Sequence, residues 1–116
     1  MTYVEGFVAA VPAANKEAYR RHAAEASLLF KEFGVTRMVE CWGDDVPDGK
    51  VTDFKKAVKA KGDETVVLAF IEWPSKDVRN AAWPKLMSDP RLHGDVDKKI
   101  FDAQRRIYGG FAPIIA

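Results

Sequence analysis

Four segments of the chain are rich in β-branched and aromatic residues and have the length of strands. They cover residues 3–11, 35–42, 65–73 and 105–111. The first is apolar except for Glu5, which predicts a buried strand ending at Pro12. The third, TVVLAFIEW, is the strongest strand signal in the chain and ends at Pro74.

One long segment, residues 16–33, has the spacing of an amphipathic helix and contains neither proline nor glycine. Asn15 stands where an N-cap is expected, and Gly34 stands where a helix leaves through a left-handed residue. Steps of three and four place one apolar stripe on this helix, formed by Tyr19, Ala23, Ala26, Phe30 and Phe33.

A second helix is predicted over residues 75–86, with Pro84 causing a kink or an early stop. A short helix is expected over residues 97–104. Residues 53–61 are compatible with either a brief helix or an extended excursion, and the pattern leaves this open.

The predicted order is therefore β-α-β, a loop excursion, and a second β-α-β. Two such halves of similar length indicate an α+β, ferredoxin-like βαββαβ fold, in which helices cover one face of a four-stranded antiparallel sheet. No low-complexity linker interrupts the 116 residues, so one domain is expected over residues 1–116.

Each of the first three predicted strands carries one glutamate in line with large apolar side chains. We expect these sets on the face that the helices leave open, because solvent does not favour so many large apolar groups and a plain core does not hold unpaired carboxylates. A second copy packed on this face would give a dimeric α+β barrel, a homodimer with a partly polar cavity. The sets are Tyr3, Glu5 and Phe7; Met38, Glu40 and Trp42; and Leu68, Phe70 and Glu72.

Composition narrows the function classes. Hydrophobic residues make up 47% and charged residues 30%, which excludes a disordered chain and a membrane protein. A net charge of +1 argues against a dedicated nucleic-acid binder, because such proteins are usually clearly basic. One cysteine, no apolar run long enough to cross a bilayer and no signal-peptide pattern make the cytoplasm the expected location.

Several segments together resemble the YbaA-like family of small bacterial proteins of unknown function. They are YVEGFV, ECWGDDVPDGKVTDF, ETVVLAFIEWPS, MSDPR and IYGGF, and they span essentially the whole chain. The resemblance implies a ferredoxin-like fold of the dimeric α+β barrel superfamily, and it implies no reaction. The chain departs from relatives at Asp102-Ala103-Gln104-Arg105, where an Asp-Gly-Lys-Arg-like turn is common, and this predicts a more helical entry to the last strand.

Five side chains are candidate walls of a ligand site. The three glutamates are candidates for acid or base chemistry if burial raises their pKa, or else for ordinary ion pairs with Arg37, Arg105, Arg106 or lysines, which is the more common outcome. Trp42 ends a strand beside an acidic loop, and Tyr108 offers a hydroxyl. The five candidates are Glu5, Glu40, Trp42, Glu72 and Tyr108.

His22 and His93 are weaker candidates. His22 lies at the edge of the apolar helical stripe, and His93 lies in a predicted loop; a histidine can exchange a proton near neutral pH in either place. Two distant histidines and Cys41, which is expected to be a buried apolar residue, do not make a metal site, so no metal and no cofactor are predicted.

The acidic loop, residues 43–53, is better explained by turn-building aspartates than by a calcium site, because its spacing does not match the helix-loop-helix calcium pattern. The basic stretch, residues 55–61, follows it directly. Two hypotheses result. The first is a homodimer that binds or transforms a small molecule; the alternative is a non-enzymatic structural or RNA-contacting module that uses the basic stretch.

Overall fold

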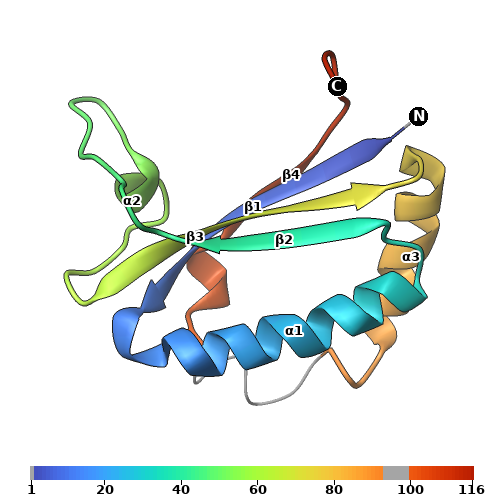
Figure 1. The fold of residues 1–116 in the computed structure, drawn as a ribbon, viewed down its shortest axis with the longest axis horizontal. Helices are drawn as coiled ribbons and strands as arrows, with labels where there is room; N and C mark the ends of the chain where they lie inside the picture. Colours follow the sequence, from blue (N-terminus) through green and yellow to red (C-terminus); the bar gives the residue numbers. More distant parts are fainter. Residues whose placement is uncertain (1, 93–99) are drawn as a thin grey trace.

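The computed structural model describes residues 2–92 and 100–116. Two long helices lie on one side of a sheet, and a loop excursion with a short helix lies on the other side (Figure 1). In chain order the elements are β1 (Tyr3–Pro12), the 3₁₀ turn η1 (Ala13–Asn15), α1 (Lys16–Glu32), β2 (Arg37–Trp42), α2 (Phe54–Ala57), β3 (Glu64–Trp73), α3 (Lys76–Ser88), the 3₁₀ turn η2 (Ala103–Arg105) and β4 (Ile107–Phe111).

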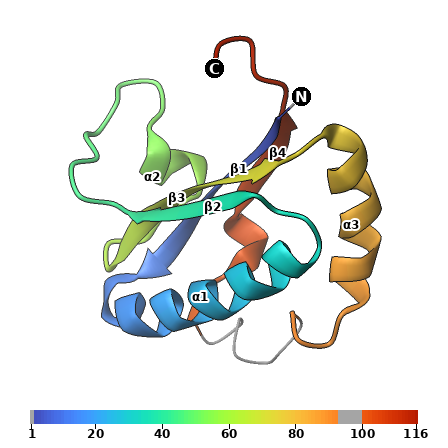
Figure 2. The ribbon, with the colours of Figure 1, turned by 45° about the vertical axis from the view of Figure 1, so that its right-hand side comes forward.

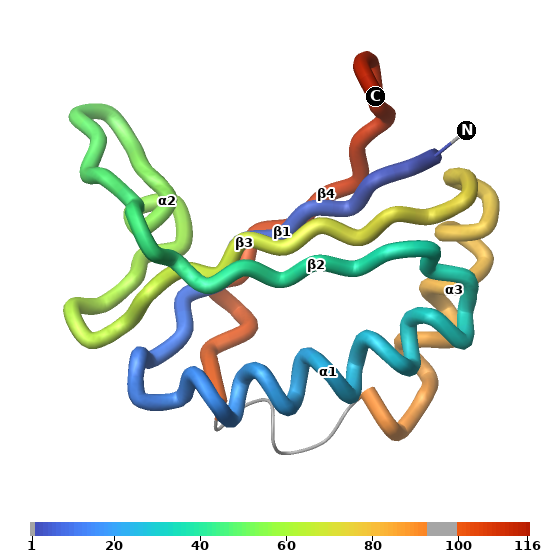
Figure 3. Tube along the Cα trace, in the orientation of Figure 1, coloured from blue at the N-terminus to red at the C-terminus, as the bar shows by residue number. Residues whose placement is uncertain are grey.

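The four strands form one antiparallel sheet in the order β2-β3-β1-β4. The two central strands are the two most apolar segments, and they pair over their whole length from Tyr3 opposite Trp73 to Pro12 opposite Glu64. This order confirms the predicted ferredoxin-like, α+β architecture. Both ends of the chain leave the sheet at the same end (Figure 3).

α1 and α3 cover one face of the sheet (Figure 2). The main core lies between them and the sheet, where Trp73 and Leu86 have no exposed surface. Its other buried members are Phe30, which belongs to the predicted apolar stripe of α1, Leu29 beside it on α1, Val35 ahead of β2, Ile71 on β3 and Ala82 on α3.

The caps and ends of α1 and α3 differ in part from those that the sequence predicts. Ser75 caps α3 by accepting a hydrogen bond from the Val78 amide at 3.2 Å, and Pro84 lies inside a helix that continues to Ser88, so the predicted early stop is wrong. Asn15 precedes α1, but its side chain gives no cap; Nδ2 instead donates to the Ile100 carbonyl at 2.9 Å. The residue thus ties the start of α1 to the chain that leads into β4.

The loop excursion between β2 and β3 covers part of the second face of the sheet. Val58, just after α2, is 1% exposed and packs on Val8, Ala10 and Val66. The helical alternative for residues 53–61 is therefore confirmed in part, and the face predicted to be free of helices is covered at one end.

Asp53 stabilises the end of the acidic loop. Its carboxylate accepts hydrogen bonds from the Lys56 amide at 2.7 Å and the Gly49 amide at 3.0 Å, so it caps α2 and closes the preceding turn. Gly49 is required there, because a Cβ would lie 2.0 Å from the Thr52 carbonyl oxygen. These contacts agree with the turn-building interpretation.

The entry to β4 is helical, as the missing glycine predicts. Asp102 accepts from the Gln104 amide at 3.0 Å at the start of η2. Arg105 then donates two hydrogen bonds of 2.7 Å to Glu64, and this pairing lowers the pKa of the Glu64 carboxyl to about 2. The predicted helix over residues 97–104 lies partly outside the described residues.

Candidate functional site

The sheet register separates the three glutamates. Glu5 lies opposite Ile71, and Glu72 lies opposite Val4, so neighbours on β1 and β3 place these two carboxylates on opposite faces. Glu40 lies opposite Ala69 on the same face as Glu5, beneath α1 and α3. The prediction that all three share the open face is wrong, because alternation within one strand does not give the register between strands.

Glu5 is 4% exposed and joins three elements. Its Oε1 accepts hydrogen bonds from Trp73 Nε1 at 2.9 Å, Trp83 Nε1 at 2.6 Å and Arg79 Nε at 3.1 Å. Arg79 also lies over the Tyr3 ring, 5.6 Å from its centroid. These donors come from β3 and α3, so the carboxylate attaches α3 to the sheet.

Glu40 accepts a short hydrogen bond on the helix-covered face. The Tyr19 hydroxyl, from α1, donates to Glu40 Oε1 at 2.5 Å. Tyr19 is 5% exposed, and a buried phenol needs a hydrogen-bond partner. From the sequence, Tyr19 is identified only as a member of the apolar stripe. A hydroxyl on a stripe that faces the sheet could have indicated a polar partner on a strand.

Burial controls the proton affinity of this pair. Burial raises the pKa of the Glu40 carboxyl, while the Tyr19 hydroxyl and the charges of His22 and Arg106 act in the opposite direction and favour the carboxylate. Burial, followed by the neighbouring Glu40 charge, raises the pKa of the Tyr19 hydroxyl well above its usual range, so tyrosine holds the proton. Glu40 is therefore the group of the pair that exchanges a proton nearest neutral pH.

A small cavity of about 190 Å³ opens beside this pair, where α1 crosses the edge strand β2. Trp42 and Lys16 form part of its wall, with the Lys16 ammonium 5.7 Å from the centroid of the Trp42 ring. Trp42 also lies 6.4 Å from the Tyr19 ring. The predicted residues Glu40 and Trp42 thus line one cavity, and the described residues around it are Lys16, Tyr19, Arg20, Ala23, Glu40, Cys41, Trp42 and Val67.

Arg106, just ahead of β4, and Tyr108, on β4, lie on the helix-covered face of the sheet. The register aligns Glu40, Ala69, Phe7 and Tyr108 in one row across the sheet. The Arg106 guanidinium lies over two rings of this row, 5.6 Å from the centroid of Phe7 and 5.5 Å from that of Tyr108. Sequence reasoning named Arg106 only as an ion-pair partner, and its stacking on two aromatic rings depends on a register that the sequence does not reveal.

His22 adds a further polar group to this region. Its ring centroid lies 6.5 Å from that of Tyr19 and 6.4 Å from that of Phe101. His22 is therefore next to the Tyr19–Glu40 pair. His93, the other histidine candidate, lies outside the described residues.

The open face carries the remaining candidates. Glu72 lies there opposite Arg37, away from Glu40. Cys41 is on the side opposite Glu40, as predicted, but it is exposed, so the expectation that it is buried is wrong. Within the described ranges, no group of three or more His, Cys, Asp or Glu is arranged to hold a metal ion.

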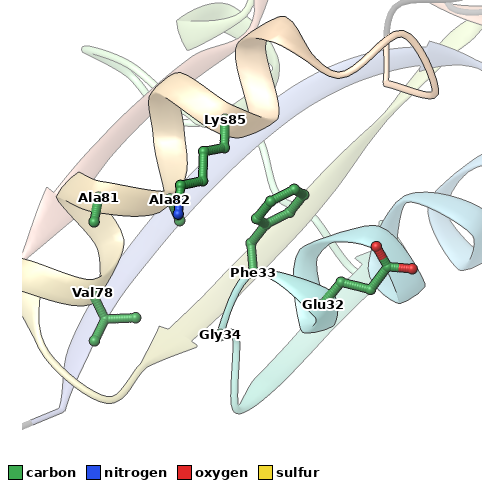
Figure 4. Close-up of a pocket in the computed structure, with 7 residues that line it drawn as sticks. All are labelled: Glu32, Phe33, Gly34, Val78, Ala81, Ala82 and Lys85. Atoms are coloured by element: carbon green, nitrogen blue, oxygen red, sulfur yellow. The ribbon is translucent and has the colours of Figure 1, made fainter.

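A second, larger concave region lies between the end of α1 and α3 (Figure 4). Its volume is about 400 Å³, and Phe33 projects into it from the end of α1 toward α3. Of the described residues that line it, Glu32 and Lys85 are the charged ones, and they lie on opposite sides of the groove. In the described part of the chain this groove contains no paired acid and base, whereas the cavity beside Glu40 holds the Tyr19–Glu40 pair.

Comparisons with known proteins agree with the resemblance found in the sequence. Residues 2–103 match the family described as "Protein of unknown function (DUF1428)". The chain is 61% identical over 115 residues to the uncharacterized protein YbaA of Escherichia coli K12, covering 99% of this chain and 98% of the relative, and equally similar to YbaA of Shigella flexneri. The chain belongs to this family. Membership of this family does not assign a reaction, because the family is described as of unknown function and the relatives as uncharacterized.

A solved structure shares the fold. It is described as a dimeric ferredoxin-like protein from an uncultured marine organism. The match covers 100% of this chain and 99% of the solved chain, with a TM-score of 0.57. The sequence identity is 11%, so the likeness concerns the fold alone. Among the described residues, no helix has the length and apolar character needed to span a membrane.

Proposed function

We propose that this protein binds a small molecule between α1 and the helix-covered face of the sheet, and that Glu40 exchanges a proton with the bound molecule. The observation that carries the proposal is the 2.5 Å hydrogen bond from the Tyr19 hydroxyl to Glu40 beside a cavity. A carboxyl in a partly buried site has its proton affinity shifted toward neutral pH, where acid or base chemistry is most effective.

The surroundings of Glu40 favour a binding role over a purely structural one. Glu5 uses one oxygen to hold three donors from two elements, whereas Glu40 has a single hydrogen-bond donor, Tyr19, among the described residues. Glu40 also lines the cavity, and Trp42 gives that cavity an aromatic wall. A concave site with apolar walls and a few polar groups is the usual form of a small-molecule site.

We also propose that the protein is a homodimer joined through the open face of the sheet. Two rows of the sheet supply apolar side chains there: Cys41, Leu68 and Ile107 in one row, where Val8 is buried under Val58, and Val39 and Phe70 in the next. Leu68 is 47% exposed, Ile107 46% and Phe111 60%, which is a large apolar area for a solvated sheet. The solved structure of the same fold is described as dimeric, which supports a homodimer.

Charge on the open face favours a second copy of this chain as the partner. Arg37 and Glu72 lie opposite each other on β2 and β3, in the row next to the apolar ones. A two-fold axis would bring this mixed-charge pair near its copy, so each arginine can face a glutamate of the other protomer. A partner of one charge sign would lack this match.

A single domain over the whole chain and a cytoplasmic location remain predictions. The RNA hypothesis also remains a prediction. Within the basic stretch, Lys56 donates to the Gly49 carbonyl and pairs with Asp53 at 3.6 Å, so this lysine helps to close the acidic loop.

The proposed function predicts that small fragments bind next to Glu40. A mixed library of aromatic and aliphatic acids, phenols and amines, observed by ¹⁵N-resolved NMR, should shift amides of α1 near Tyr19 and of β2 near Trp42. Glu40→Gln keeps the side-chain shape and should weaken the hits by about 10-fold, equivalent to one charge-assisted hydrogen bond. Glu25→Gln, an exposed position on α1, is the matched control and should leave them unchanged.

A library without any hit at these amides would contradict the binding site. Hits that bind Glu40→Gln and the unmodified protein equally would contradict the role of Glu40 while leaving the cavity as a binding site.

A further inference from the structure

We infer that the ligand of the cavity beside Glu40 is a small aromatic monocarboxylate with a hydroxyl or amino group at the far end of its ring, and that Lys16 binds its carboxylate. This inference rests on the proposed function, because it names the ligand class of the same cavity. It follows from two lining side chains of opposite charge, Lys16 and Glu40, and from the size of the space between the walls.

Lys16 holds its ammonium group at the aromatic wall of the cavity. Both Lys16 and Trp42 line the cavity, and the Lys16 nitrogen lies 5.7 Å from the centroid of the Trp42 ring. A ring attracts an ammonium group through its face but is no strong acceptor for the three N–H donors. Within the described ranges, Lys16 forms no ion pair with a carboxylate. These donors are therefore available to an anionic group of a ligand.

Arg20, the other cation of the lining, is already paired. Its guanidinium lies 3.1 Å from the carboxylate of Glu17, and both side chains are exposed on α1. Lys16 thus supplies the positive charge of the lining that no described carboxylate balances. One such charge matches a monocarboxylate, whereas a dianionic phosphate would leave excess negative charge near Glu40 whenever Glu40 is ionised.

Glu40 determines the group at the other end of the ligand. Its Oε1 accepts from the Tyr19 hydroxyl, whereas Oε2 accepts from no residue that the structure describes. Every buried polar side-chain atom of the described residues has a hydrogen-bond partner, so Oε2 is not buried. A carboxylate accepts hydrogen bonds on both oxygens. A ligand hydroxyl or amino group would therefore donate to Oε2.

Volume and spacing limit the ligand to one ring. A cavity of about 150 Å³ holds benzene, so the cavity of about 190 Å³ admits one ring with small substituents and excludes a nucleotide. Glu40 and Trp42 are two residues apart on β2, which corresponds to roughly 6–7 Å along the strand. A ring with substituents at opposite ends has a similar length. Ala23 and Val67 give its body an apolar surface.

The test compares three probes by ¹⁵N-resolved NMR titration. 4-Hydroxybenzoate carries both groups, 4-hydroxybenzamide has nearly the same shape without the charge, and benzoate lacks the hydroxyl. 4-Hydroxybenzoate should shift amides of α1 near Tyr19 and of β2 near Trp42. It should bind about 10-fold more tightly than either of the other probes, the value of one charged contact.

Lys16→Gln removes the charge and keeps most of the side-chain length. This variant should weaken 4-hydroxybenzoate binding by about 10-fold and leave 4-hydroxybenzamide binding unchanged, so the preference for the carboxylate is lost. Lys16→Arg keeps the charge and should keep most of the preference. Lys31→Gln, at an exposed lysine in the last turn of α1, is the matched control and should keep the full preference.

The outcomes separate the two proposals. If 4-hydroxybenzoate binds no more tightly than the amide, or if Lys16→Gln keeps the preference, the assignment of the carboxylate to Lys16 is overturned, while hits from the mixed library at these amides leave the binding site in place. Equal affinity for benzoate and 4-hydroxybenzoate would overturn the hydroxyl or amino group of the ligand. If neither these probes nor any library fragment shifts these amides, both proposals fail.

Discussion

Replacing Glu5 by alanine should lower the free energy of unfolding by about 3–5 kcal/mol, the cost of removing one partner from a buried charged cluster. Glu5 is 4% exposed, and its Oε1 is the acceptor for Trp73, Trp83 and Arg79. Alanine would leave two indole N–H groups and a guanidinium without this acceptor and would open a cavity between β1 and α3. Because many domains have only about 5–15 kcal/mol of stability, the loss should be evident in the unfolding midpoint.

Urea unfolding followed by tryptophan fluorescence at a fixed protein concentration measures this loss. Glu5→Gln keeps an oxygen acceptor and should cost less, about 1–2 kcal/mol. Glu17→Ala is the matched control: its ion pair with Arg20 is exposed on α1, so a change within about 0.5 kcal/mol is expected. A loss below about 1 kcal/mol for Glu5→Ala would show that this carboxylate does not attach α3 to the sheet.

Leu68→Asp should dissociate the proposed dimer, raising its dissociation constant by more than about 100-fold. The side chain is 47% exposed on the open face, so the monomer accepts aspartate without burying its charge. A face-to-face dimer would bury two such carboxylates, one from each protomer, and each would cost several kcal/mol. Because about 1.4 kcal/mol corresponds to a 10-fold change in affinity, the dissociation constant should rise by more than about 100-fold.

Sedimentation velocity over a range of concentrations measures this change. Met87→Asp is the matched control, because Met87 is 58% exposed on α3, on the opposite side of the sheet, and its replacement should leave the dimer intact. An unmodified protein that sediments as a monomer at about 100 µM would contradict the dimer, since stable dimers have dissociation constants well below that value. A Leu68→Asp dimer would show that another surface forms the interface.

The sequence predicts the fold well because each element carries its own local signal. Alternating and continuous apolar runs identify the strands, and the apolar stripe with Gly34 identifies α1, where Gly34 has a φ of 112°. Its limits appear where tertiary contacts decide. Pro84 lies within α3 because packing of Ala82 and Leu86 outweighs the missing amide hydrogen bond.

The candidate site is less predictable, because it depends on relations between strands. Glu5 and Glu72 each follow the alternation of their own strand, yet the pairing of Val4 with Glu72 places them on opposite faces. Partners also come from distant segments: Arg79 and Trp83 lie more than 70 positions from Glu5, with separations of 74 and 78 residues. Glu40 and Trp42 do line one cavity, because both belong to β2 and alternation within one strand is enough to place them on the same face.

The titration of Glu40 tests the central claim most directly. Carbon-detected NMR of the side-chain carboxyl should give a pKa above the usual range of a glutamate, because burial outweighs the groups that face it, Tyr19, His22 and Arg106. Tyr19→Phe removes a donor that stabilises the carboxylate and should raise the pKa further. An ordinary Glu40 pKa in the unmodified protein, or a decrease in Tyr19→Phe, would contradict a buried, proton-exchanging carboxyl at this site.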